Sequence, residues 1–166
     1  ADHDVPHVVT VATEHPAVLD PCSALAEEGA RVTRLPVDGD GLVDPAQVAE
    51  AIEAETVVVS VMAANTEIGV LQPIEQIGAI CAERGVLFHS DAAQAVGTVP
   101  LSVEAAGLHL LSVSGHKLYG PKGVGALVVR RRAHGKRLRL VPLQYGGGHE
   151  QGLRSGTLPV PLLAGL

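Results

Sequence analysis

Lys117 and Asp91 are the two residues whose type and position in the chain most strongly suggest chemistry. Each follows an apolar run typical of a buried strand: residues 108–113 before Lys117 and residues 86–89 before Asp91. A lysine just beyond a buried strand needs a partner or a task, and its amine can act as a nucleophile or a general base. An ionised carboxylate in such a place needs a cationic partner. The simpler alternatives are an exposed lysine and a helix-capping aspartate.

Other polar residues follow the same strands and two further ones. Ligands bind at the carboxyl ends of the strands in an open α/β sheet, so these residues predict one site. A lysine and a carboxylate in one site are what pyridoxal 5'-phosphate (PLP) requires, the amine for a Schiff base and the acid for the pyridine nitrogen. The polar residues after the strands are Thr13, Glu14, His15, Asn65, Thr66, Glu67, Ser90, Asp91, Gln94, Ser114, His116 and Lys117.

Strand and helix patterns alternate along the chain that carries these residues. Strands are predicted over residues 8–13, 31–35, 56–62, 86–89, 108–113 and 125–130, and helices over 16–28, 46–54 and 73–84. Gly29 and Gly85 end two of the helices, and Asp44 caps the start of another. Pro21 fits poorly inside the first helix unless Asp20 caps a second start there. This alternation predicts an α/β domain with a mostly parallel sheet.

The composition excludes several classes of protein. The chain has 166 residues, 46% of them hydrophobic and 18% charged, which is too apolar for a disordered segment. No apolar run approaches the roughly 20 residues that span a bilayer, and the polar, acidic start is no signal peptide. We therefore expect a cytoplasmic protein without a membrane partner. The chain has no initiator Met, and residues 158–166 begin a helix that is cut short, so we expect a piece of a longer protein.

Cysteines, histidines and basic residues outside the predicted site give weaker signals. Cys22 and Cys81 fit no disulfide or metal pattern and are expected to be small buried side chains. No metal site is expected from the histidines: His3, His7, His109 and His134 lack ligand spacing, and His89 is left open between pocket and core. Six basic residues between positions 130 and 139 suggest either a phosphate or nucleic-acid patch or a solvated turn. With only three aromatic residues in the chain we favour the turn and expect no nucleic-acid partner. The six are Arg130, Arg131, Arg132, Lys136, Arg137 and Arg139.

Five segments together resemble one known family. They cover nearly the whole chain in the right order, and the run from Ser114 to Gly123 is highly specific. The chain resembles the cysteine desulfurases of the iron–sulfur-cluster and nitrogen-fixation type, which belong to the class V aminotransferase group of fold-type I PLP enzymes. The segments are Thr13-Glu14-His15-Pro16-Ala17-Val18, Asn65-Thr66-Glu67-Ile68-Gly69, His89-Ser90-Asp91-Ala92-Ala93-Gln94, Ser114-Gly115-His116-Lys117-Leu118-Tyr119-Gly120-Pro121-Lys122-Gly123, and Gly146-Gly147-Gly148-His149-Glu150 through Arg154-Ser155-Gly156-Thr157.

The resemblance implies a fold and a role for each matching residue. The fold would be the three-layer, aspartate aminotransferase-like large domain, with residues 1–166 as its central part. The N-terminal phosphate-loop segment and the C-terminal small domain would be absent. Lys117 and His15 would be catalytic. The implied roles are ring stacking for His15, the ring hydroxyl for Gln94, a place near that hydroxyl for Thr66, cofactor binding for Asn65, the pyridine nitrogen for Asp91, phosphate for Ser114 and His116, and the Schiff base for Lys117. Thr157 would reach the phosphate of a neighbouring subunit's cofactor, which implies a homodimer.

The implied reaction converts L-cysteine to L-alanine and passes sulfur to a protein cysteine as a persulfide. The sulfur would then reach acceptor or scaffold proteins for iron–sulfur cluster synthesis. Two departures from the family pattern are Thr66, where an Asn is usual, and His149, where a Gln is common. The nucleophilic Cys and the Arg for the substrate carboxylate would lie outside this segment, so we expect it to release no sulfur alone. The alternatives are a selenocysteine lyase, another class V lyase or aminotransferase, and a truncated non-catalytic module.

Overall fold

Within the residues that the structure describes, six strands form one sheet at the centre of the molecule. The computed structural model describes residues 5–130 and 138–166. The strand order is β2-β1-β3-β4-β5-β6, and all neighbouring pairs are parallel except β5 and β6. The strands are β1 (His7–Val11), β2 (Arg31–Leu35), β3 (Thr56–Ser60), β4 (Leu87–Asp91), β5 (Leu110–Ser114) and β6 (Gly125–Val129). The predicted mostly parallel α/β sheet is confirmed.

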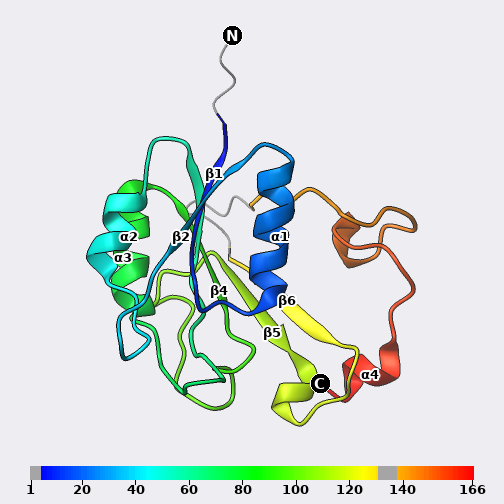
Figure 1. Ribbon diagram of the computed structural model, residues 1–166. Coiled ribbons are helices and arrows are strands. Elements are labelled where there is room, and N and C mark those ends of the chain that lie inside the picture. Colours follow the sequence, from blue (N-terminus) through cyan, green and yellow to red (C-terminus); the bar gives the residue numbers. More distant parts are fainter. Residues whose placement is uncertain (1–4, 131–137) are drawn as a thin grey trace.

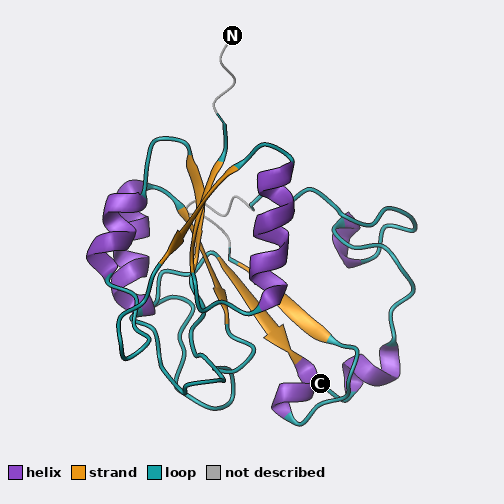
Figure 2. Ribbon diagram, in the orientation of Figure 1, coloured by secondary structure: helices purple, strands orange, loops and turns teal. Residues whose placement is uncertain are grey.

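Helices lie on both sides of this sheet and make three layers (Figures 1 and 2). Helix α1 (Pro16–Glu27) covers one face, and α2 (Pro45–Ala51) and α3 (Ile74–Arg84) cover the other. The core lies on the α2–α3 side, where alternate strand residues such as Val9, Val59 and Phe88 are fully buried. Because side chains alternate along a strand, their neighbours Thr10, Ser60 and His89 point to the opposite face, the side of α1.

The helix ends follow the local signals in the sequence. The Asp44 carboxylate accepts the Ala46 N–H at 2.8 Å and caps α2, and Gly85 ends α3 with a φ of 69°. Pro21 lies inside α1, which continues through it, so the alternative of a second helix start at Asp20 does not apply.

Several element boundaries differ from the predicted ones by a few residues. β1 and β3 end at Val11 and Ser60, before the polar loops, whereas β4 continues to Asp91 because that residue pairs with Ser112 of β5. Strand pairing with a neighbour decides these ends, and no local pattern in the sequence contains it. The described residues also include the short helices η1 (Gly115–Leu118), η3 (Glu150–Gly152) and α4 (Val160–Ala164).

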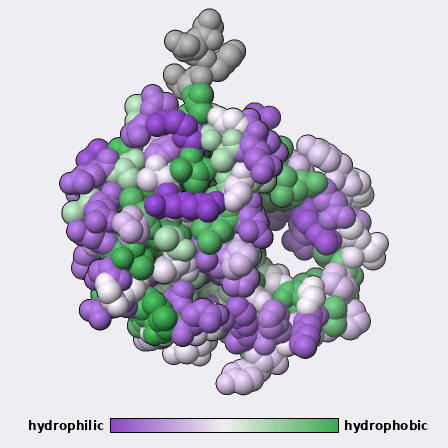
Figure 3. Space-filling model, in the orientation of Figure 1, coloured by the Kyte–Doolittle hydropathy of each residue, from purple (hydrophilic) through white to green (hydrophobic). Residues whose placement is uncertain are grey.

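The segment from residue 138 onward runs beside the sheet rather than within it. The space-filling view is hollowed between this segment and the main body (Figure 3). The segment exposes the apolar side chains of Val141, Leu143 and Tyr145. Among the described residues, no helix combines the length and apolar character needed to cross a membrane.

Candidate active site

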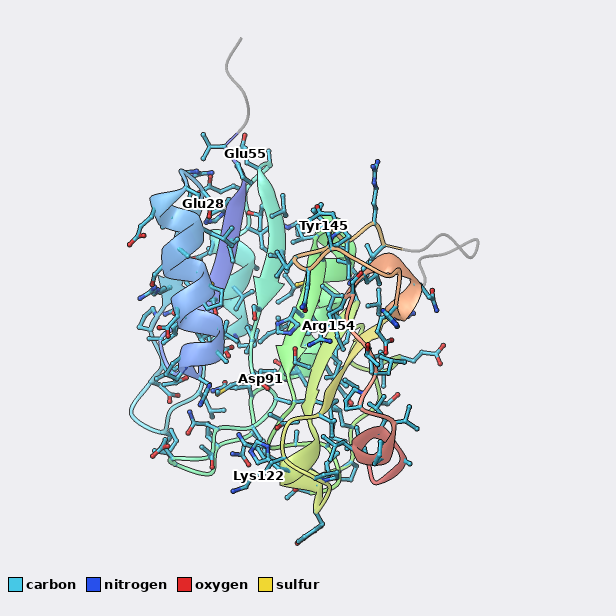
Figure 4. All side chains as sticks on the ribbon, turned by 90° about the vertical axis from the view of Figure 1, so that its right-hand side faces the viewer. Glu28, Glu55, Asp91, Lys122, Tyr145 and Arg154 are labelled. Carbon is cyan, nitrogen blue, oxygen red and sulfur yellow. The ribbon has the colours of Figure 1, made fainter. Side chains whose placement is uncertain are left out.

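The predicted site residues meet where the parallel strands end. Figure 4 shows Asp91 at one edge of the sheet and Glu55, which precedes β3, at the opposite edge. A pocket at the Asp91 edge is lined by residues that follow β1, β3, β4 and β5. Five of them were predicted from the sequence, and Met62, Ala64 and Ala93 were not. The lining residues are His15, Met62, Ala64, Thr66, Asp91, Ala93, Gln94 and Lys117.

His15 lines this pocket from the start of α1. Its backbone is extended, with φ −66° and ψ 150°, and its Nδ1 accepts the Ala17 N–H at 3.1 Å. An accepting Nδ1 carries no proton, so the proton of the neutral ring is on Nε2. Sequence reasoning missed this capping role because Ser, Thr, Asp and Asn are the usual N-cap residues. The cap anchors an exposed imidazole ring at the mouth of the pocket.

Asp91 is the last residue of β4 and is half-buried. Its Oδ1 accepts the Ala93 N–H at 2.9 Å, which is a capping interaction. No other hydrogen bond to this carboxylate comes from the described residues. The structure has no helix directly after Asp91, so the side chain caps a turn and not a helix, and its second oxygen is left for a partner in the pocket.

Lys117 reaches the pocket from η1, the tight turn after β5. The side chain is half-buried and, within residues 5–130 and 138–166, has no ion-pair partner. The turn closes through Tyr119, which has a φ of 63°, and Gly120, where a Cβ would lie 2.9 Å from the Gly115 carbonyl oxygen. A backbone this close-packed holds the lysine at a fixed place on the edge of the sheet.

Thr66 and Gln94 line the pocket, whereas Asn65 lies beside it. The Asn65 Nδ2 donates to the Thr13 carbonyl at 3.0 Å, and its Oδ1 accepts the N–H groups of Glu67 and Ile68. Both ends of the Asn65 side-chain amide therefore fasten the loop that carries Thr66 to the residues after β1. A direct contact of Asn65 with a cofactor stays a prediction.

Ser114, His116 and Thr157 do not line the pocket. The Ser114 Oγ and the His116 Nδ1 lie 3.1 Å apart at the end of β5, and Thr157 is exposed in the loop before α4. Their assigned phosphate contacts stay predictions.

Glu14 is a functional candidate that the sequence did not single out beyond its place after β1. It is 5% exposed, its Oε1 accepts the Met62 N–H at 2.5 Å, and its Oε2 finds no hydrogen-bond partner among the described residues. Burial raises its pKa to about 8, which the Asp91 charge reinforces and the Met62 N–H opposes. The protonated acid ties the loop after β1 to the pocket residue Met62.

His89 belongs to neither the core nor the pocket, the two possibilities that the sequence left open. Its Nδ1 lies 2.8 Å from the Ser60 Oγ and its Nε2 lies 2.9 Å from the Ser112 Oγ. Burial lowers its pKa, and the Asp91 charge opposes that effect. The His89 ring on β4 is thus hydrogen-bonded to β3 on one side and to β5 on the other, two residues before the pocket residue Asp91.

The remaining histidines and the cysteines are structural where the structure describes them. The His7 ring bridges Thr56 and Thr33 at 2.8 and 2.9 Å, and the His109 Nδ1 accepts the Phe88 N–H. Cys22 and Cys81 are buried, as predicted, and burial raises the pKa of Cys81 to about 12.

His3, His134 and four of the six clustered basic residues (Arg131, Arg132, Lys136 and Arg137) lie outside the described residues. In the described ranges, no group of three or more His, Cys, Asp or Glu side chains is placed to hold a metal ion.

The donor set of the pocket fits PLP. A carboxylate with one free oxygen suits a protonated ring nitrogen, and an amine on a neighbouring strand end suits an aldehyde. An imidazole, an amide and a hydroxyl (His15, Gln94 and Thr66) surround them. The fold and this set define a class: α/β proteins with a polar pocket at the carboxyl edge of a mostly parallel sheet.

The sequence profile of the aminotransferase class V family matches residues 3–166, so the chain belongs to that family. Among curated relatives, the mitochondrial cysteine desulfurase of Drosophila melanogaster is 59% identical over 160 residues, which is 96% of this chain and 34% of that protein. The cysteine desulfurase of Mus musculus is 56% identical over 96% of this chain, and IscS of Rickettsia bellii is 53% identical over the same share.

Solved structures show the same likeness. A structure described as SspA in complex with cysteine is 43% identical, with a TM-score of 0.92 over 98% of this chain and 46% of the other. A NifS-like protein is 38% identical, with a TM-score of 0.89 over 99% of this chain and 44% of the other. The fold and family predictions are thereby confirmed. The chain spans 34–38% of the length of the curated relatives named above.

Proposed function

We propose that this chain is the cofactor-holding part of a PLP-dependent cysteine desulfurase. The observation that carries the proposal is the convergence of Lys117, Asp91 and His15 on one pocket from three different strand ends. The relatives at 52–59% identity bear that enzyme's name, and one solved neighbour is in complex with cysteine. L-cysteine is therefore the proposed substrate.

In this proposal, bound PLP supplies a conjugated ring that withdraws electrons from the substrate α-carbon. Asp91 would hold the ring nitrogen through its free carboxylate oxygen and keep it protonated. His15 would cover the ring and exclude water, while Gln94 and Thr66 would offer hydrogen bonds to it. The Lys117 amine would anchor the cofactor and move protons at the substrate.

The later steps of sulfur transfer need groups that the described residues do not offer. Both thiols of this chain are buried, and a pKa of about 12 for Cys81 leaves almost no thiolate at neutral pH. We propose that a cysteine elsewhere in the complete enzyme receives the sulfur as a persulfide, for delivery to acceptor or scaffold proteins in the cytoplasm. We also propose that a second copy completes the site, with Thr157 reaching the neighbour's phosphate.

Cofactor binding is the direct test of the proposal. PLP added to the chain should give a visible absorbance band that survives dialysis, and Lys117→Ala should abolish it. Lys122→Ala is the matched control because Lys122 is exposed in the same loop and should leave the band intact. Absence of a band in the unmodified chain, or equal loss in both variants, would refute the proposed site.

Turnover tests the activity assigned to the complete enzyme. The chain alone should release no sulfide from L-cysteine in the presence of a thiol reductant. A hybrid in which it replaces the matching segment of the 59% identical Drosophila relative should release sulfide and alanine. Replacing Lys117 in that hybrid should remove turnover. An active isolated chain would contradict the account of the buried thiols.

A further inference from the structure

A row of three polar side chains crosses the sheet next to Asp91, on the side nearer the start of the strands. Ser60 of β3, His89 of β4 and Ser112 of β5 form it, with hydrogen bonds of 2.8 and 2.9 Å on either side of the imidazole. Strand pairing fixes this arrangement, since Ser60 is in register with His89 and Ser112 with Asp91. Both ring nitrogens are therefore engaged across the sheet.

The two partners of His89 are hydroxyl groups, which fit a neutral ring. A neutral imidazole has one donor and one acceptor nitrogen, and a serine hydroxyl can complement either. Among the described residues, the charge that raises the His89 pKa is the Asp91 carboxylate. The hydrogen-bond partners of His89, Ser60 on β3 and Ser112 on β5, carry no charge. Burial lowers the His89 pKa despite the opposing Asp91 charge, so the fold favours the neutral form of the ring.

Asp91 lies two residues beyond His89 on the same face of β4. Two residues of a strand span about 6.6 Å, a distance that a turned imidazole can bridge toward a carboxylate. A protonated His89 turned in this way would pair with Asp91. The pair would occupy the oxygen that Asp91 leaves free and would place a positive charge below the pocket.

We propose that Ser60 and Ser112 hold His89 across the sheet, away from Asp91, so that the carboxylate stays available to a cationic group bound in the pocket. His89 and the two serines are thus positioning residues. The inference rests on the proposed function in one respect, namely that the cationic group is the protonated ring nitrogen of PLP.

The holding of His89 can be tested without any cofactor. In an NMR titration of the histidine rings, with the His89 signal assigned by its loss in His89→Gln, the unmodified chain should show a midpoint below the ordinary value. The double variant Ser60→Ala/Ser112→Ala should raise that midpoint by at least one pH unit, because the freed ring pairs with Asp91. An unchanged or lower midpoint would overturn the proposal.

A matched control exists elsewhere in the sheet. His7 is held between the hydroxyls of Thr33 and Thr56 in the same manner but at the opposite end of the strands. The variant Thr33→Val/Thr56→Val should disturb the His7 signal and leave the His89 midpoint where it was. A shift of His89 in that control would reveal a general loosening of the sheet and would count against a specific role for the serines.

Cofactor affinity provides the second readout. PLP affinity of the unmodified chain should be steady between pH 6 and 8, whereas the Ser60→Ala/Ser112→Ala variant should lose about tenfold toward the acid end. Adding His89→Gln to that variant should restore the steady profile, because no cation can form. A loss that persists in the triple variant would mean a structural role only. Failure of the unmodified chain to bind PLP would refute the proposed function, while the histidine titration would still decide the holding of His89.

Discussion

At the scale of single residues, burial in the fold changes the pKa of side chains that support the site. Glu14 is the extreme case, because its carboxyl is buried with one oxygen bound to the Met62 N–H and the other without a partner in the part of the chain that the structure describes. Its pKa of about 8 means that the folded chain binds a proton there at neutral pH. Asp91, which is half-buried, is the carboxyl side chain that lines the pocket itself.

The Glu14 carboxyl should make stability depend on pH, with Glu14→Gln as the test. Its pKa is raised from 4.5 in the unfolded chain to about 8 in the folded one, so the folded state binds the extra proton between these values. The free energy of unfolding should therefore be greatest below pH 4.5 and fall toward pH 8, by at most about 1.4 kcal/mol per pH unit from this group.

Urea unfolding of both proteins at pH 5 and pH 8 measures the effect. Glu14→Gln keeps the acceptor for Met62 but cannot ionise, so its stability should change less between the two pH values. Glu67→Gln is the control, because Glu67 is exposed and has no place in the pocket. Identical pH profiles for Glu14→Gln and the unmodified chain would contradict a protonated Glu14.

The sequence predicted the residues that line the pocket better than the contacts that hold those residues in place. Lys117, Asp91, Gln94, Thr66 and His15 are visible because reactive groups follow apolar strands. The capping by His15 is local but comes from a residue type that is not a usual cap, whereas the protonation of Glu14 and the row through His89 arise from contacts between strands that are distant in the chain. Short-range patterns carry no record of those contacts, so these features needed the structure.

At the scale of elements, close backbone contacts fix the parts that present the site. Helix α3 approaches the loop before β5 at Gly78, where a Cβ would overlap the Ala106 carbonyl oxygen. The glycine lowers the helix propensity of α3, and the close contact explains why it is tolerated. The loop so fixed leads directly into β5, the strand that ends before Lys117.

Gly78→Ala distinguishes the effect of helix propensity from the effect of packing, because the two change the free energy of unfolding in opposite directions. Alanine in a helix interior gains about 1 kcal/mol over glycine, whereas overlap with backbone costs several kcal/mol. We expect a loss of at least 2 kcal/mol in urea unfolding. Ala79→Gly, at the exposed neighbouring position, should lose only about 1 kcal/mol. A stabilised Gly78→Ala variant would show that α3 can move away from the loop without cost.

Tyr119→Gly tests the turn that carries Lys117. Tyr119 has a φ of 63° and a fully exposed side chain. Its left-handed backbone is therefore strained, and its side chain makes no buried contacts that would offset the strain. Glycine should relieve about 1 kcal/mol, partly offset by its greater freedom in the unfolded chain. Gly120→Ala, with its Cβ near the Gly115 carbonyl, should instead destabilise the chain. Thermal unfolding compares the two, and a clear loss in Tyr119→Gly would refute the assignment of strain.

At the scale of the whole molecule, sequence patterns predicted the sheet class but not its order. Parallel strands with helices between them follow from the alternation of the elements, and the helices on both faces follow from the parallel connections. The place of β1 between β2 and β3, and the antiparallel return of β6, depend on contacts between distant segments. The pocket inherits this order, because it draws residues after β1, β3, β4 and β5, four strands that are consecutive in the sheet.

A ligand that joins these four strand ends should stabilise the sheet as one unit. At a PLP concentration about 100 times its dissociation constant, binding adds about 2.7 kcal/mol, which raises the melting temperature by roughly 5–10 °C for a chain of this size. Hydrogen exchange should slow together at the loops after all four strands, because His15, Thr66, Asp91 and Lys117 share the bound ring. In Lys117→Ala the melting temperature should rise far less. Protection confined to η1 would indicate a Schiff base with a reactive lysine and no ring held by Asp91 and His15, so the pattern of protection distinguishes a built cofactor site from simple modification of an amine.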